Sequence, residues 1–261
     1  MKVNMQDWNT DLYLQYENGR NKPIYDLISH IPLKTAKRII NIGCGPGNST
    51  IFLKKWFPDS EIIGMDNSIN MIEKAKELYP NITWLLKDAN NGLSDMGKFD
   101  IVFSNSVLHW LPNHKDILLQ FFGLLQKNGV VAIQIPYFFG TPIYGPLYDL
   151  IKSKKWNTYI ENKEPTTYHN LDFYYEILST HFKIFDIWTT KHTHILNSRN
   201  DIIDWYKPTG FKPFLDQLGT EEIKKKFLND ISKIIDELYM PQKDGNFLLC
   251  FERLFFIGQK D

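Results

Sequence analysis

Three glycines and one aspartate in this chain have the residue types and spacing of a nucleotide-type binding site. Gly43, Gly45 and Gly47 follow an apolar run at 39–42, and a second apolar run ends at Asp66. In open α/β sheets, ligands bind at the carboxyl ends of the strands. Glycines let the backbone pass close to a ligand, and an acid 19 positions after Gly47 can accept hydrogen bonds from both hydroxyls of a ribose.

The glycine spacing separates two classes of ligand. The pattern is G-x-G-x-G, which is shorter than the G-x-G-x-x-G turn that aims a helix N-terminus at the pyrophosphate of a dinucleotide. S-Adenosylmethionine carries no phosphate, so its site needs only close backbone approach and an acid for the ribose. The spacing therefore favours S-adenosylmethionine. A dinucleotide oxidoreductase and a structural turn without any ligand are the alternatives.

The composition narrows the class of protein. At 261 residues with 43% hydrophobic content, the chain can bury a large core. The 30 basic and 30 acidic residues cancel, so we expect no general attraction to nucleic acid or to a membrane. The sequence has no long apolar run and no signal-peptide core at its start, which predicts a cytoplasmic protein.

The cysteines and histidines form no reactive or metal-binding pattern. Cys44 lies within the glycine turn and Cys250 in an apolar strand, so we expect no disulfide in a reducing compartment. Cys44 has no adjacent basic partner, and we interpret it as a small residue that fits a tight turn. His192 and His194 lack a third ligand nearby, so we predict no metal site.

Strand and helix patterns alternate over the first 150 residues, which predicts βαβ units and a parallel sheet. Two helices are expected upstream, at 8–18 and 22–30, with Pro23 in the first turn of the second. Asn128 with Gly129 is expected to end the third of the later helices. The predicted strands span 37–42, 61–66, 82–86, 99–104 and 129–135, and the predicted helices span 48–56, 68–78 and 114–126.

The pattern changes after Pro136, where an aromatic, Gly- and Pro-rich segment leads into further helices. A helix at 170–180, a strand at 183–194, a helical insertion at 199–239 and a final strand at 246–257 are predicted. We therefore expect one α/β domain over 1–261 that carries a helical cap over the strand tips, which would close a pocket for a small molecule. The predicted cap elements are 1–30, 137–170 and 195–240.

Several segments resemble the class I S-adenosylmethionine-dependent methyltransferases, and most closely the trans-aconitate methyltransferase branch. They are DWNTDLYLQYENGRNKP, NIGCGPGNST, FSNSVLHWLPNH, YYEILS, FDIWTT, IIDWYKPTGFKPFL and FERLFFI. The resemblance implies a Rossmann-like sheet that is mostly parallel with one antiparallel strand. It also implies an enzyme that uses S-adenosylmethionine to methylate a carboxylate of a small polycarboxylic acid.

The resemblance also implies roles for individual residues of the donor site. The three glycines would wrap the methionine end of the donor, and the acid of the second strand would take the ribose. Residues that follow the second and third strands would flank the adenine, and those after the fourth strand would line the methionine. The implied set is Gly43, Gly45, Gly47, Met65, Asp66, Asn67, Asp88, Ala89, Asn105 and Ser106.

The chain departs from the family pattern in three places. Asn41 stands in the first strand where an acid is usual. The run Tyr137–Phe139 follows the fifth strand, where a more polar segment is expected. Lys22 and Lys212 stand where the family tends to have arginine. These differences bear on how the donor is held and on which acid is the acceptor.

Arginine is scarce, which makes its positions informative. Only Arg20, Arg38, Arg199 and Arg253 are present among the 30 basic residues. A carboxylate-binding fork is a place where lysine does not replace arginine. Arg20 lies in a cap motif and Arg253 lies in an apolar strand, where an internal salt bridge is the alternative role. The predicted substrate-binding residues are Arg20, Trp110, Tyr137, Trp205, Lys212 and Arg253.

Carboxylate methylation asks for no general base, because an acid with a pKa near ~4 is already ionised at neutral pH. Alignment of the reacting atoms can contribute roughly 7–11 kcal/mol, so we predict catalysis by positioning, with no catalytic side chain and no metal. Another acid, such as a carrier-protein-bound malonyl group, is one alternative acceptor. A non-catalytic S-adenosylmethionine-binding protein is the alternative outside enzymes, and both a monomer and a homodimer fit the sequence.

Overall fold

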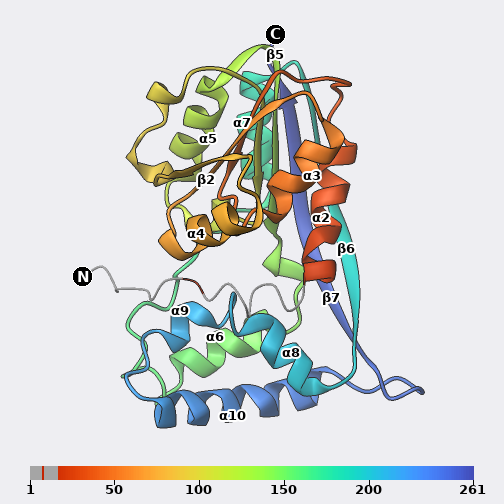
Figure 1. Cartoon of the computed structure of the whole chain (residues 1–261). Helices are drawn as coiled ribbons and strands as arrows, with labels where there is room; N and C mark the ends of the chain where they lie inside the picture. The colour runs from red at the N-terminus through yellow and green to blue at the C-terminus, as the bar shows by residue number, and fades with distance from the viewer. Residues whose placement is uncertain (1–7, 9–16) are drawn as a thin grey trace. The chain divides into compact units, whose positions relative to one another are not determined.

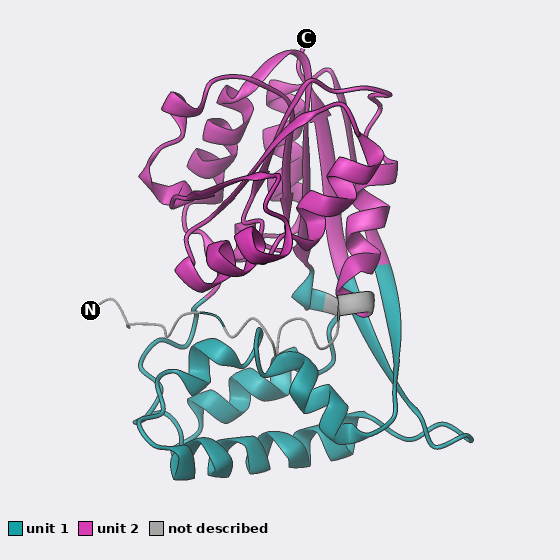
Figure 2. Cartoon of the chain, in the orientation of Figure 1, with its two compact units in different colours: residues 1–16, 137–165, 191–252 teal, residues 17–136, 166–190, 253–261 magenta. Residues whose placement is uncertain are grey.

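A computed structural model describes Trp8 and residues 17–261 of the chain (Figure 1). The chain divides into two compact units (Figure 2). Unit 1 comprises Met1–Tyr16, Tyr137–Pro165 and Lys191–Glu252, and unit 2 comprises Glu17–Pro136, Thr166–Thr190 and Arg253–Asp261. The predicted cap over the strand tips stays a prediction.

The strands form a seven-stranded sheet in the order β3-β2-β1-β4-β5-β7-β6. The neighbours from β3 to β5 pair in parallel, and β5 pairs antiparallel with β7. This confirms the predicted Rossmann-like sheet with an antiparallel strand. The strands are β1 (Arg38–Ile42), β2 (Glu61–Asp66), β3 (Thr83–Leu86), β4 (Phe99–Asn105), β5 (Leu125–Pro136), β6 (Ile184–Leu196) and β7 (Phe247–Gln259).

One face of the sheet in unit 2 is covered by α2 (Glu17–Ser29) and α3 (Asn48–Trp56). Leu27 of α2 and Leu53 of α3 are fully buried in one cluster with strand residues such as Phe255. Each such side chain contributes roughly 1.5–3 kcal/mol by leaving water. The apolar runs of the central strands therefore form because both of their faces are covered.

The opposite face is packed by α5 (His114–Gly123) and α7 (Leu171–His181). Tyr174 of α7 stacks on Phe256 of β7 with ring centroids 5.2 Å apart. Phe122 of α5 meets the edge of Phe182 at 4.6 Å. Phe255 and Phe256 are neighbours in β7, so their side chains point to opposite faces of the sheet and join its two layers of helices.

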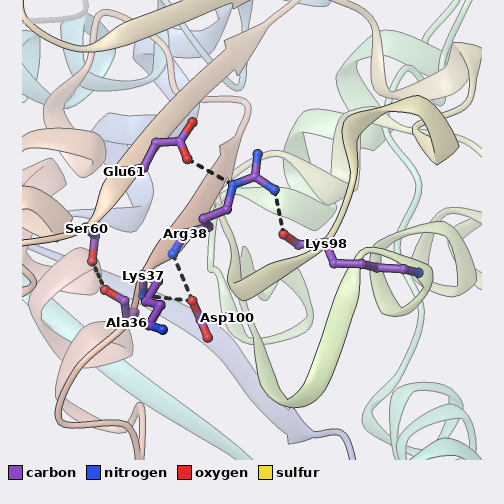
Figure 3. Close-up of polar contacts among 7 residues, drawn as sticks. All are labelled: Ala36, Lys37, Arg38, Ser60, Glu61, Lys98 and Asp100. Carbon is purple, nitrogen blue, oxygen red and sulfur yellow. Dashed lines mark hydrogen bonds and ion pairs between the residues drawn. The ribbon is translucent and has the colours of Figure 1, made fainter.

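A polar network ties together the amino ends of β1, β2 and β4 (Figure 3). Asp100 Oδ2 accepts hydrogen bonds from the backbone N–H of Lys37 at 2.7 Å and of Arg38 at 2.8 Å. The Arg38 side chain donates to Glu61 Oε2 and to the Lys98 carbonyl, each at 2.9 Å. These contacts give Arg38 a structural role at the edge of the sheet far from the glycine turn.

Two predicted helix boundaries are wrong. Helix α2 begins at Glu17, so Pro23 lies inside it and not in the first turn. Helix α5 ends at Gly123, and β5 begins at Leu125. The apolar residues around 121–125 fit both a helix and a strand, so their spacing could not locate the boundary. Asn128 adopts a φ of +61° within β5 and does not end a helix. The predicted helix at 8–18 lies almost entirely outside the described residues.

Unit 1 is helical apart from the ends of β6 and β7, and its core is aromatic. Trp156 meets the edge of Phe227 at 4.9 Å and donates from Nε1 to Asp230 Oδ2 at 3.0 Å.

Among the described residues, no helix is both long and apolar enough to cross a bilayer. The remaining helices of the described residues are α4 (Ile69–Leu78), α6 (Tyr144–Lys152), α8 (Arg199–Tyr206), α9 (Lys212–Leu215) and α10 (Glu221–Leu238), with short turns η1 (Ala89–Asn91), η2 (Ser94–Met96), η3 (Leu108–Trp110) and η4 (Phe138–Gly140).

Candidate functional site

Strands β3, β2, β1 and β4 are consecutive neighbours in the sheet. Their carboxyl ends therefore follow one another along a single edge in unit 2. The glycine turn follows β1, Asp66 ends β2, Asp88 comes two residues after β3, and Asn105 ends β4. All the predicted donor-site residues thus lie along the same edge, which is where ligands bind in sheets of this type.

The glycine turn needs its glycines for different reasons. Gly43, Gly45 and Gly47 have φ angles of +72°, +54° and +102°, in the left-handed region that disfavours residues with a side chain. A Cβ on Gly43 would lie 2.1 Å from Val107 Cγ2, and one on Gly47 would lie 2.8 Å from the Tyr79 ring. A Cβ on Gly45 would meet nothing within 4 Å. The turn is therefore packed on both sides and open at Gly45.

Asp66 links the glycine turn to the following helix. Its Oδ2 accepts a hydrogen bond from Gly45 N–H and its Oδ1 accepts one from Ser68 N–H, each at 2.9 Å. The Met65 carbonyl accepts from Gly43 at 2.7 Å and Cys44 at 2.9 Å. The carboxylate is thereby oriented beside the open part of the turn, as an acid that accepts ribose hydroxyls must be.

Cys44 is a packing residue. Burial raises the pKa of its thiol, and the nearby Asp66 carboxylate raises it further. The thiolate, and not the thiol, is the nucleophile. A buried cysteine with a raised pKa stays protonated at neutral pH, which agrees with its interpretation as a small residue in a tight turn.

Asn41, at a position where the resemblance led us to expect an acid, has a structural role. It is fully buried, and its Nδ2 donates to Ser49 Oγ and Thr50 Oγ1, each at 2.7 Å. These bonds fasten the first turn of α3 to β1. A carboxylate at this position could not donate these hydrogen bonds.

Asp88 begins the turn η1. Its Oδ1 accepts from the backbone N–H and from Nδ2 of Asn90, each at 2.9 Å, while Ala89 is buried behind it. Asn67, beyond the tip of β2, is exposed. The geometry of Asp88 is that of a helix cap, and its predicted contact with adenine stays a prediction, as does that of Asn67.

The end of β4 contains a residue with an unusual backbone conformation, and its partner was missed in the sequence. Ser106 has a φ of +61°. Its N–H donates to the Gln134 carbonyl at 2.9 Å and its hydroxyl donates to Gln134 Oε1 at 2.8 Å. Gln134 is fully buried. The available signal was a single amide in the apolar run VVAIQIP at 130–136.

A buried histidine pair follows β4. His109 is 4% exposed, and its pKa is lowered to about 3 by burial, then by His114 and by Arg253. The pKa of His114 is lowered to about 4, chiefly by burial and then by His169. His114 Nδ1 lies 2.7 Å from Tyr174 Oη. Both rings are therefore neutral at pH 7, and the guanidinium of Arg253 lies near enough to His109 to affect its pKa.

Comparison with known proteins identifies the family. Residues 33–200 match the family model described as a methyltransferase domain. The chain is 35% identical to the trans-aconitate 2-methyltransferase of Methylobacterium radiotolerans over 98% of this chain and 99% of that protein. It is 33% identical to that of Yersinia pestis over 97% and 98% of the two chains. The chain belongs to the trans-aconitate 2-methyltransferase family.

The fold agrees with this assignment. A solved Bacillus halodurans protein superposes with a TM-score of 0.59 at 13% identity, over 91% of this chain and 98% of that one. The protein is an S-adenosylmethionine-dependent methyltransferase, and the open turn at Gly45 with the oriented Asp66 fits that donor. The family match does not favour a dinucleotide oxidoreductase.

The predicted substrate-binding residues of this methyltransferase are divided between the two units. Arg20, Trp110 and Arg253 belong to unit 2. Arg20 lies in α2 and is half-buried, and the Trp110 ring lies 4.8 Å from that of His109. Arg253 is 5% exposed and pairs in register with Pro136 at the end of β5. Trp110 therefore lies beside His109, and Arg253 contributes to the low pKa of that ring.

The other three belong to unit 1 and are engaged within it. Lys212 forms a buried ion pair with Asp216 at 2.5 Å. The Trp205 ring lies 4.3 Å from that of His194 in the core of unit 1. Tyr137 donates its backbone N–H to the Glu252 carbonyl at 2.9 Å. These contacts account for their positions, and their roles toward a substrate stay predictions.

Proposed function

We propose that this enzyme transfers the methyl group of S-adenosylmethionine to a carboxylate of a small polycarboxylic acid related to trans-aconitate. The products are the monomethyl ester and S-adenosylhomocysteine. The observation that carries the proposal is the similarity to two trans-aconitate 2-methyltransferases over nearly the whole of both chains. Such coverage includes the segments outside the methyltransferase domain, from which an acceptor pocket would be built.

The bound donor supplies an electrophilic methyl carbon on a positive sulfur. Gly43, Gly45 and Gly47 would let the backbone approach its methionine end, and Asp66 would accept the ribose hydroxyls. Two donor contacts through Asp66 explain why an acid is needed at the tip of β2. The remaining proposed donor contacts are Met65, Asn67, Asp88, Ala89, Asn105 and Ser106.

The acceptor step needs alignment and no proton transfer. A lone pair of the acceptor carboxylate attacks the methyl carbon, and the carbon–sulfur bond breaks with its electron pair on sulfur. The carboxylate is ionised at neutral pH, so no base is required. The pKa values of His109 and His114, lowered to about 3 and about 4, make both rings weak bases, which fits a reaction that needs no base. Protein groups hold the two reactants in line and exclude water.

Arg253 is the proposed grip on a second carboxylate of the acceptor. It is buried in unit 2, and a guanidinium can hold a carboxylate through two parallel hydrogen bonds. Arg20 and Trp110 are the further contacts proposed from the same unit. A remote carboxylate that is gripped orients the reacting one, which raises the rate through binding energy away from the reaction centre.

The proposal is tested with labelled S-adenosylmethionine and a panel of acceptors. The panel contains trans-aconitate, a saturated tricarboxylate, a dicarboxylate and a monocarboxylate of matched size, and a malonyl-loaded carrier protein. We expect label in a base-labile ester of the polycarboxylates, with the monocarboxylate poor. Label only on the carrier protein, or on none of the acceptors, would refute the proposed acceptor class. Size-exclusion chromatography separates the monomer from the homodimer.

A further inference from the structure

Ser106 holds a backbone conformation that its side chain does not favour. Its φ of +61° is in the left-handed region, where the Cβ of an L-residue is crowded by the following carbonyl oxygen. Asparagine tolerates this region better than serine does, and the other two described non-glycine residues with positive φ, Asn113 and Asn128, are asparagines. Such a conformation persists only where surrounding contacts determine it.

Gln134 provides those contacts from the neighbouring strand. Asn105 of β4 and Gln134 of β5 are register partners. The next residue, Ser106, therefore lies just beyond the paired part of β4. Gln134 accepts both hydrogen bonds of Ser106, one from the backbone N–H at 2.9 Å and one from the hydroxyl at 2.8 Å. The backbone bond alone would be available to any residue at 134, whereas the hydroxyl bond requires the amide.

The amide is costly at this position. Gln134 is completely buried in a strand whose neighbours are apolar, and its Nε2 has no hydrogen-bond partner in the part of the chain that the structure describes. An unsatisfied buried donor destabilises a fold, and an apolar residue of the same shape would avoid that cost. The presence of an amide here therefore points to a role other than stability.

The conformation of Ser106 sets the position of the next residue in the chain. That residue, Val107, packs directly against the glycine turn, because a Cβ on Gly43 would lie 2.1 Å from Val107 Cγ2 and 2.7 Å from Cγ1. A change of φ at Ser106 would turn Val107 away from Gly43. One buried side chain on β5 thus controls how the loop after β4 closes on the turn after β1.

We propose that Gln134 is a positioning residue of the donor site, which holds Ser106 in the left-handed conformation and so sets Asn105–Val107 against the glycine turn. This inference rests on the proposed donor site, and it is independent of the proposed acceptor. Without the amide, Ser106 relaxes into an ordinary conformation in most molecules. Donor affinity is then multiplied by the fraction of molecules in which the site is still formed.

The test measures S-adenosylhomocysteine binding by calorimetry. Gln134→Met keeps the length of the side chain and the backbone bond and removes the amide. We expect the Kd to rise roughly tenfold, as the left-handed preference is lost. Adding Ser106→Gly should return the Kd to within about threefold of the wild-type value, because glycine adopts a positive φ without support. Asn128→Gly, at the far end of β5, is the matched control and should restore nothing.

A merely structural role gives different results. If Gln134→Met acted by general destabilisation, Ser106→Gly would lower the melting temperature further and leave binding weak. Binding by Gln134→Met equal to the wild type, or no restoration by Ser106→Gly, overturns the proposal. If Gln134→Met does not fold, the single variants decide the question. Ser106→Gly must then bind more tightly than Ser106→Ala, and equal weakening of the two would assign the hydroxyl to direct ligand contact.

The readout separates this proposal from the function proposed above. S-Adenosylhomocysteine binds without an acceptor, so an enzyme that methylates none of the tested carboxylates can still show the expected pattern of Kd values. A wild-type chain that does not bind S-adenosylhomocysteine at all would refute the donor site itself and this inference with it.

Discussion

The buried histidines His109 and His114 predict a loss of stability in mild acid. Burial lowers their pKa values from 6.5 to about 3 and about 4, respectively. In the unfolded chain both rings take up protons once the pH falls below 6.5, whereas the folded chain keeps them neutral. The unfolded state therefore binds more protons, and the free energy of unfolding falls as the pH falls through this window.

The magnitude follows from the two pKa values of each ring. At pH 5 an unfolded histidine with a pKa of 6.5 is stabilised by about 2 kcal/mol through protonation. The folded rings gain almost nothing at that pH. The two histidines together should remove about 4 kcal/mol between pH 8 and pH 5, a large part of the roughly 5–15 kcal/mol of a typical domain. The pKa of His169 is also lowered by burial, which acts in the same direction.

The measurement is urea unfolding at pH 5, 6, 7 and 8 on the wild type and on His109→Gln, His114→Gln and the double variant. Each single variant should lose about half of the pH dependence, whatever its stability at pH 8. The double variant should lose most of the pH dependence, and the remainder should come from His169. His30→Gln, which replaces an exposed histidine, is the matched control. A wild-type stability that is constant from pH 8 to pH 5 would refute the reasoning, since it would mean that these rings protonate equally in both states.

Three further predictions concern the donor and acceptor sites. Asp66→Ala should weaken S-adenosylhomocysteine binding by on the order of 3 kcal/mol, since two charge-assisted bonds are lost; calorimetry checks this, and unchanged affinity contradicts the ribose assignment. Gly43→Ala should lower the melting temperature more than Gly45→Ala does, because only the first new Cβ would clash, with Val107; equal losses in thermal unfolding would contradict this. Arg253→Lys should lower kcat/KM for a polycarboxylate by roughly tenfold, because a point charge replaces a fork. Arg38→Lys, at the opposite edge of the sheet, is the control and should not lower it. Steady-state kinetics that show no difference between the two variants would contradict the proposed carboxylate contact of Arg253.

The parts of the fold that the sequence predicts are those determined locally. The strand at Arg38–Ile42, the glycine turn and the acid at Asp66 are contiguous, and their order is enough to place them at one edge of a parallel sheet. The family resemblance added the antiparallel last strand. The end of α5 at Gly123 could not be located, because neighbouring apolar residues satisfy both a helix and a strand. Pro23 inside α2 was misplaced because proline is usually found at helix starts.

Gln134 was missed for a different reason. Its importance depends on its register partner Asn105, which lies 29 positions away (134 minus 105), and on the φ of Ser106. Neither is a property of the local sequence. The pairing of β4 with β5 brings them together only after the sheet has formed. The sequence shows such a contact only as a single amide in an apolar strand. A buried amide costs folding free energy, and this cost indicates that the amide has a role.

The same distinction, between features encoded locally and contacts between distant segments, applies to the donor and the acceptor of this methyltransferase. In the proposed donor site, recognition would rest largely on backbone geometry, in which Gly43, Gly45 and Gly47 would allow close approach; Asp66 is oriented by the N–H groups of Gly45 and Ser68. Three glycines and one acid are enough to encode such features. The proposed acceptor recognition would rest on side chains such as Arg253, which come from segments distant in sequence. If Arg253 grips the acceptor as proposed, its guanidinium acts as a fork and not as a diffuse basic patch. An acceptor is then selected by the placement of its second carboxylate, and matched mono- and dicarboxylates are the acceptors that distinguish a fork from a patch.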